Sequence, residues 1–145
     1  MSLTISPTLL DEIREYGRAS YPHECCGLLL GNSNHTTKAA TALRPVLNRR
    51  QDTPQNRYLI APEDWLAAER ETRKLGLDII GVYHSHPDHP ARPSEFDREH
   101  AFPFYSYIIV SVASGEAAEL TSWTLRDDRS EFDPEELLSI VEGRT

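Results

Sequence analysis

The segment between residues 77 and 97 constrains the fold most strongly, because it joins a buried strand to a stretch that no hydrophobic core accommodates. Residues 77–83 read LDIIGVY, a short apolar run with β-branched and aromatic side chains that is typical of a buried strand. Residues 84–97 read HSHPDHPARPSEFD, with three histidines, three carboxylates and three prolines. Polar side chains at the end of a buried strand are typical of a functional site, because loops positioned by a rigid scaffold carry much of a protein's chemistry.

The other hydrophobic patterns alternate between helical and strand periods, which indicates an α/β fold. Ser6 and Pro7 are a favourable N-cap and first helical residue, and Gly76 stands where a helix C-cap is expected. The sequence predicts helices at 7–19, from 61–62 to 76 and from Asp133-Pro134 onward, and strands at 25–31, 35–46, 57–60, 77–84, 106–113 and 118–127. The first two strands are expected to pair as a hairpin. We therefore expect a single α/β domain over residues 1–145, in which helices flank a mixed β-sheet.

Composition and charge exclude several classes of function. The 145 residues are enough to form a hydrophobic core without disulfides or a structural metal. Lys and Arg number 15 against 23 Asp and Glu, for a net charge of −8, whereas nucleic-acid binding requires a basic surface. No apolar run reaches the roughly 18 residues of a membrane span, and the N-terminus lacks the pattern of a signal peptide. We expect a cytoplasmic protein that binds neither nucleic acid nor membranes, and the sequence leaves its oligomeric state open.

Cys25 and Cys26 are the two cysteines of the chain, and because they are adjacent they cannot build a framework of disulfides. Neighbouring side chains on a strand point to opposite faces of the sheet. We therefore expect two small apolar strand residues, one on each face of the sheet.

His84 and His86 are two positions apart, so they share one face of the predicted strand. Two imidazoles on one face form half of a zinc site, and Pro87 is expected to end the hydrogen bonding of the strand beside them. Ser94 is a typical helix N-cap, which places Asp97 in the first helical turn and facing the same way. His84, His86 and Asp97 are therefore candidate zinc ligands that leave a fourth position open, as catalytic zinc sites do.

Other interpretations of these residues stay open at this point. Ser94 and Asp97 also fit a helix-capping device that has no part in metal binding. Asp88 and His89 lie in the same Pro-rich loop and could be ligands too. The histidines at positions 23, 35 and 100 are isolated in the sequence, which is more typical of surface or supporting residues than of ligands.

The spacing of the candidate residues resembles the signature of the JAMM family of zinc metalloproteases, also called MPN+ or Mov34/PAD-1. That signature is His-x-His-x7-Ser-x2-Asp, and His84, His86, Ser94 and Asp97 match it. The family also has a glutamate on its first strand, and the segment ECCGLLLG supplies Glu24 at the matching place. The resemblance extends more weakly to the opening helix, the segment RYLIAPED and a late strand. It implies an MPN/JAB1-like fold with a cytidine-deaminase-like architecture.

The resemblance also implies a role for each of the five residues. His84, His86 and Asp97 would hold Zn²⁺, which lowers the pKa of a water molecule towards about 7. Glu24 would accept the proton of that water as a general base and deliver it to the leaving amine. Ser94 would help the metal to stabilise the oxyanion and would not itself be the nucleophile. On this interpretation the chain is a zinc-dependent metallopeptidase or isopeptidase.

JAMM enzymes act on the amide or isopeptide bond at the C-terminus of ubiquitin or ubiquitin-like proteins. The short connection between Asp97 and the strand at 106 resembles the minimal prokaryotic type, for which the implied substrate is a ubiquitin-like or sulfur-carrier protein that ends in Gly-Gly. Release of cysteine from such a carrier is one role of this type. The non-enzymatic alternative is an MPN scaffold that binds partner proteins without catalysis.

Two other classes of zinc hydrolase are excluded by the positions of histidines and cysteines. The segment HECCG has Gly27 where a zincin requires its second histidine. A zinc deaminase requires a Pro-Cys-x-x-Cys motif, whereas the two cysteines of this chain are adjacent.

Overall fold

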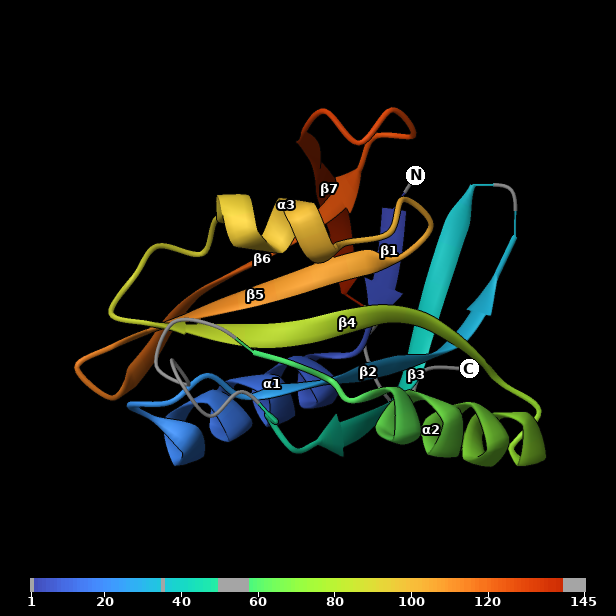
Figure 1. Ribbon diagram of the computed structural model, residues 1–145, viewed down its shortest axis with the longest axis horizontal. Coiled ribbons are helices and arrows are strands. Elements are labelled where there is room, and N and C mark those ends of the chain that lie inside the picture. The colour runs from blue at the N-terminus through green and yellow to red at the C-terminus, as the bar shows by residue number, and fades with distance from the viewer. Residues whose placement is uncertain (1, 35, 50–57, 140–145) are drawn as a thin grey trace.

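The computed structural model describes residues 2–34, 36–49 and 58–139. In chain order the elements are β1 (Ser2–Ile5), α1 (Pro7–Ser20), β2 (Cys26–Ser33), β3 (Thr37–Val46), α2 (Pro62–Lys74), β4 (Asp78–Pro87), α3 (Glu95–His100), β5 (Ser106–Ala113), β6 (Glu116–Leu125) and β7 (Phe132–Ser139) (Figure 1). The predicted α/β class and the predicted hairpin of the first two long strands are confirmed. None of the described helices is long and apolar enough to cross a lipid bilayer.

Within the described residues, the strands form one closed mixed sheet in the order β1-β3-β2-β4-β5-β6-β7. β2 pairs antiparallel with β3 and β4, and β6 pairs antiparallel with β5 and β7. β4 pairs parallel with β5, and β1 pairs parallel with both β3 and β7. Figure 1 shows β4 crossing the middle of the molecule between β2 and β5, with α3 in the connection that follows it. A short loop, residues 88–94, connects the end of β4 to the start of α3.

Two hydrophobic clusters lie on the two faces of the sheet. The first packs against α1 and contains Leu3, Ile5, Ile13, Cys25, Leu29, Ala40, Ile80, Tyr83, Ile108, Val110 and Val112. The second packs against α2 and contains Cys26, Leu28, Leu30, Ile60, Ala68, Val82, Ala101, Tyr107 and Leu125. Side chains that are adjacent on a strand fall in different clusters, as strand alternation requires. Cys25 and Cys26 divide in the same way and are free thiols, which confirms their predicted placement on opposite faces.

Gly81 begins the parallel ladder of β4 and β5, where it lies opposite Ser106. A Cβ atom at this position would lie 2.3 Å from the carbonyl oxygen of Ser106 and 2.8 Å from Cδ1 of Leu29. Because the oxygen belongs to the backbone, the two strands would have to separate. We expect Gly81→Ala to lower the free energy of unfolding by about 1–3 kcal/mol, measured by urea unfolding with circular dichroism. An unchanged midpoint of unfolding would show that the strands tolerate the separation.

The predicted helix at Asp133 and Pro134 is wrong, because this segment forms β7. An Asp-Pro pair favours a helix start locally, but β7 pairs with β6 on one side and with β1 on the other. These ladders satisfy the backbone polar groups of the segment, so tertiary pairing overrides the local preference. β1 was not predicted, because four residues are too few for the alternation of Leu3 and Ile5 to stand out.

β4 is longer than predicted and differs on its two sides. Its ladder with β5 continues as far as Pro87 opposite Val112, so the prediction that Pro87 ends the hydrogen bonding is wrong on this side. Its ladder with β2 ends at His84 opposite Cys26. His86 therefore has a paired strand on one side only. The short strand predicted at 57–60 is absent from its described residues 58–60, and position 57 lies outside the described residues.

Candidate metal and catalytic site

Two histidines of β4 point to the same side of the sheet. The ring centroids of His84 and His86 are 5.0 Å apart, and both side chains are buried. Ser85 lies between them and points the other way, where its Oγ accepts a hydrogen bond of 2.8 Å from the backbone N–H of Cys25. The N–H of Ser85 donates in return to the carbonyl oxygen of Cys25, at 3.2 Å. These two hydrogen bonds attach β4 to the residue that follows Glu24.

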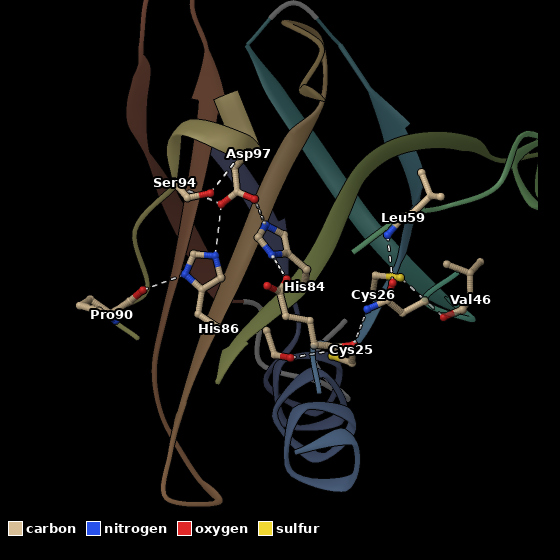
Figure 2. A network of polar contacts seen from close by, with 12 residues as sticks. Cys25, Cys26, Val46, Leu59, His84, His86, Pro90, Ser94 and Asp97 are labelled. Atoms are coloured by element: carbon tan, nitrogen blue, oxygen red, sulfur yellow. Dashed lines mark hydrogen bonds and ion pairs between the residues drawn. The ribbon is translucent and has the colours of Figure 1, made fainter. Parts of the chain in front are cut away.

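α3 begins with a capping box that fixes the carboxylate of Asp97. Oγ of Ser94 accepts a hydrogen bond of 3.0 Å from the N–H of Asp97, and Oδ2 of Asp97 accepts one of 2.9 Å from the N–H of Ser94. The carboxylate is thereby held toward β4, with Oδ2 3.2 Å from Nε2 of His86 and Oδ1 3.9 Å from Nε2 of His84 (Figure 2). The capping box therefore begins α3 and also places the Asp97 carboxylate beside His84 and His86.

The far side of each imidazole determines which ring nitrogen is free to bind a metal. Nδ1 of His86 lies 2.9 Å from the carbonyl oxygen of Pro90, and Nδ1 of His84 lies 3.3 Å from Oε1 of Glu24. A carbonyl and an ionised carboxylate only accept hydrogen bonds, so each neutral ring carries its hydrogen on Nδ1. Both Nε2 lone pairs then face the Asp97 carboxylate. When both rings are neutral, three electron-pair donors converge there.

This convergence fits a divalent metal ion. Two imidazoles and a carboxylate are a usual donor set for zinc, and ligands about 2.0–2.1 Å from a tetrahedral ion lie roughly 3.3 Å apart. The separations of 3.2 and 3.9 Å are close to that spacing.

Burial would lower the pKa of His86, but the hydrogen bond and charge of Asp97 raise it above its usual value. The site therefore attracts positive charge.

The pKa of Asp97 also reflects the attraction between its carboxylate and the two histidines. Burial would raise it, but the charge of His84, the hydrogen bond and charge of His86 and the N–H of Ser94 hold the pKa of this carboxyl well below its usual range. Asp97 is thus an anion at neutral pH, which is the form in which a carboxylate binds a metal.

Glu24 lies at the opposite edge of the His84 ring and is 4% exposed. One ligand atom from each of Glu24, His84 and His86 lies within 4.8 Å of the others, so these three residues also form a group that could hold a metal ion. The lone-pair argument distinguishes the two carboxylates, because Asp97 faces the Nε2 atoms and Glu24 faces an Nδ1 atom. A metal held at both Nε2 atoms would therefore lie beside Asp97, whereas Glu24 would face the other edge of the His84 ring.

The loop between β4 and α3 is held from several sides. Three successive carbonyl groups, those of His89, Pro90 and Ala91, face Oγ of Ser111 at 2.6 Å, Nδ1 of His86 at 2.9 Å and Oγ1 of Thr121 at 2.6 Å. Asp88 also anchors the loop, because Oδ2 accepts from the hydroxyl of Tyr21 and Oδ1 from the N–H of Ser114, both at 2.7 Å. Both carboxylate oxygens of Asp88 therefore accept hydrogen bonds from groups other than His84 and His86.

Two hollows open beside His86 and Asp97. The larger has a volume of about 460 Å³ and is lined by Glu24, His86, His89, Pro90, Arg92, Ser94, Glu95 and Phe96. The smaller has a volume of about 150 Å³, reaches Asp97 from the other side and is lined mainly by aromatic and aliphatic side chains, among them Tyr58, Trp65, Phe102 and Tyr107. His89 belongs to the larger hollow and is not part of the buried group of possible ligands.

Two contributions to the site have no signal in the sequence pattern. Tyr58 stacks on the imidazole of His84, with ring centroids 4.6 Å apart, although it lies in a segment predicted as a strand. The carbonyl group of Pro90 orients His86, and a backbone group cannot be identified from residue type. The thiols beside Glu24 stay protonated at neutral pH, because burial raises the pKa of Cys25 to about 11 and that of Cys26 still further.

Known proteins are similar to this chain in sequence. Residues 6–126 match Prok-JAB, described as prokaryotic homologs of the JAB domain. The chain is 37% identical over 105 residues to a desampylase of Haloferax volcanii, which covers 72% of this chain and 73% of that protein. It is 32% identical over 101 residues to a probable TtuB-protein conjugate cleaving protease of Thermus thermophilus, which covers 70% of this chain and 64% of that protein.

A solved structure is similar over almost the whole chain. Protein DSY2949 of Desulfitobacterium hafniense has a TM-score of 0.84 and 30% identity, and the match covers 97% of this chain and 94% of that one. Together with the family match, this similarity confirms the resemblance to JAMM/MPN proteins that the spacing of the histidines, serine and aspartate indicated. The chain therefore belongs to the Prok-JAB family, the prokaryotic homologs of the JAB domain.

Proposed function

We propose that this protein is a zinc-dependent hydrolase that cleaves the amide bond after the C-terminal Gly-Gly of a ubiquitin-like or sulfur-carrier protein. The observation that carries the proposal is the convergence of two Nε2 lone pairs and the Asp97 carboxylate beside the buried Glu24. The names of the relatives support the substrate class, since one is a desampylase and the other a probable TtuB-protein conjugate cleaving protease. We further propose that residues 1–145 form one domain, because β1 and β7 lie side by side in the closed sheet.

In this proposal His84, His86 and Asp97 hold zinc. Bound zinc supplies Lewis-acid chemistry, because it polarises oxygen atoms and makes water more acidic. Glu24 lines the larger hollow and lies beside His84, so its carboxylate takes the proton from the attacking water. The same carboxyl group then delivers that proton to the leaving amine. The buried position of Glu24 keeps this proton away from bulk water during the transfer.

Ser94 acts on the carbonyl oxygen of the substrate. Its Oγ accepts a hydrogen bond from the N–H of Asp97, so its own hydroxyl hydrogen is free to donate. Ser94 also lines the larger hollow with Glu24. A hydroxyl in this position donates to the negative charge that develops on the carbonyl oxygen, as donors of an oxyanion hole do.

Removal of the Ser94 hydroxyl is expected to lower kcat by about 10²–10³-fold without loss of zinc. Ser94→Ala also removes the helix N-cap, which lowers the free energy of unfolding by about 1 kcal/mol. Ser94→Gly lowers it by only a few tenths of a kcal/mol. We therefore expect equal losses of activity in both variants and a larger fall in melting temperature in Ser94→Ala alone. Activity that follows the melting temperature would mean that Ser94 is a cap and nothing more.

The function is tested with zinc-loaded protein and a ubiquitin-like carrier that ends in Gly-Gly. The carrier is joined either to the ε-amine of a lysine peptide or to one further amino acid, and the products are identified by mass spectrometry. We expect cleavage after the second glycine in at least one of the two conjugates. A protein that binds no zinc and cleaves neither conjugate would instead be an MPN scaffold.

A further inference from the structure

Arg92 is a charged residue of the larger hollow that the proposed mechanism leaves unused. It lines the hollow together with Glu24, His86 and Ser94. Its side chain is exposed, and among the residues that the structure describes no carboxylate pairs with its guanidinium. Arg98 on the neighbouring α3, by contrast, is engaged by Glu95. A free guanidinium therefore faces the space that a substrate would enter.

The backbone at Arg92 is fixed before any substrate binds. Pro90 and Pro93 restrict the chain on both sides, and the N–H of Arg92 donates to the carbonyl oxygen of Pro90 at 2.8 Å. The preceding residue, Ala91, is buried and its carbonyl accepts a hydrogen bond of 2.6 Å from Thr121. Binding through Arg92 consequently needs ordering of one side chain and not of the loop.

A guanidinium in such a position recognises an anion, because its planar fork matches a carboxylate with two parallel hydrogen bonds. The leaving group of the proposed reaction can supply that anion. In a single α-amino acid, the carboxylate is attached to the same carbon as the nitrogen of the scissile bond. In a lysine side chain, the ε-nitrogen is separated from the backbone by the whole aliphatic chain, and no carboxylate has a fixed place near it.

We propose that Arg92 binds the α-carboxylate of a leaving amino acid, so that the enzyme favours carriers whose Gly-Gly is extended by one residue with a free C-terminus. This inference rests on the proposed function and names the leaving group at the same site. Water adds across the amide: a C–O bond forms at the glycine carbonyl, the C–N bond breaks, and its electron pair leaves on nitrogen. Glu24 transfers one proton from the water to that nitrogen, and Arg92 keeps its own protons throughout.

The test compares two substrates that differ in one group. Each is a Gly-Gly carrier extended by a single alanine, which ends either in a free carboxylate or in a carboxamide. We expect zinc-loaded wild-type protein to favour the free carboxylate in kcat/KM by about 10- to 100-fold, the range for hydrogen bonds to charged groups. Arg92→Gln should abolish this preference, and Arg92→Lys should keep part of it, because the charge remains and the fork is lost.

Arg70→Gln is the matched control, since Arg70 is an exposed arginine of α2 that does not line the hollow. This variant should keep the wild-type preference. The ratio of the two kcat/KM values is unaffected by a general loss of folded protein, so an equal ratio in wild type and Arg92→Gln overturns the inference. If a lysine-linked conjugate is still cleaved in that case, the proposed function stands. If the wild type cleaves none of the three substrates, the proposed function fails and this inference fails with it.

Discussion

Glu24→Gln is expected to lower the rate of hydrolysis by about 10²–10⁴-fold, the usual contribution of general acid–base catalysis. The substitution replaces a carboxylate by an amide of the same size, which cannot take up the proton of the attacking water. The amide oxygen can still accept from Nδ1 of His84, where Oε1 of Glu24 lies 3.3 Å away. Fold and bound zinc should therefore be retained. Single-turnover kinetics, zinc content by elemental analysis and the melting temperature are to be measured on the same preparation.

The matched control for this substitution is Glu12→Gln, because Glu12 is an exposed residue of α1 that does not line the hollow beside the site. It removes the same charge and should leave the rate unchanged. The close grouping of Glu24 with the two histidines makes a second outcome informative. If Glu24→Gln stays folded but loses its zinc, Glu24 is a ligand and the proposed assignment of base and ligands is wrong.

Asp97→Asn is expected to weaken zinc binding by at least about 100-fold, the upper end of what the loss of a supporting group costs a metal site. The amide keeps an oxygen that can accept from the N–H of Ser94, so the capping box and the start of α3 should survive. It removes the negative charge that faces both Nε2 atoms. Competition with a zinc chelator measures the affinity, and Asp78→Asn, an exposed aspartate of β4, is the control.

The same variant separates metal binding from folding. Neither hydrophobic cluster contains a candidate zinc ligand, so zinc-free protein should keep its far-UV circular dichroism. Zinc should stabilise the wild type by mass action, about 2.7 kcal/mol at a concentration 100 times the Kd. Asp97→Asn should lose this zinc-dependent rise in melting temperature. A wild-type chain that unfolds when zinc is removed, or a variant that binds zinc normally, would contradict the assignment.

The candidate site could be predicted from the sequence to the extent that local rules determine it. Strand alternation puts His84 and His86 on one face, and the N-cap preference of Ser94 fixes the start of α3 and the direction of Asp97. Both are short-range effects, so a pattern of fourteen residues contains them. The structure adds what depends on distant segments: the ring of Tyr58 on His84, and the separate contacts of Glu24 and Asp97 at the two edges of that ring.

The ends of the described chain could not be predicted, because their structure comes from partners far away in the sequence. Asp133 and Pro134 favour a helix by themselves, and only β6 and β1 on either side make this segment a strand. The extension of β4 beyond His84 depends in the same way on β5, which continues to pair when β2 has ended. Local propensity is a weak guide where such long-range pairing satisfies the backbone.

β1 contributes only Ser2–Ile5, yet it is the segment that joins β3 to β7. A chain cut after Ile5 would have two open edges at once, with free N–H and C=O groups along the start of β3 and along β7. Open edges of this kind are templates on which other chains add strands. By covering both edges, β1 is expected to protect the folded protein against self-association, so proteolytic removal of Ser2–Ile5 should lower its solubility.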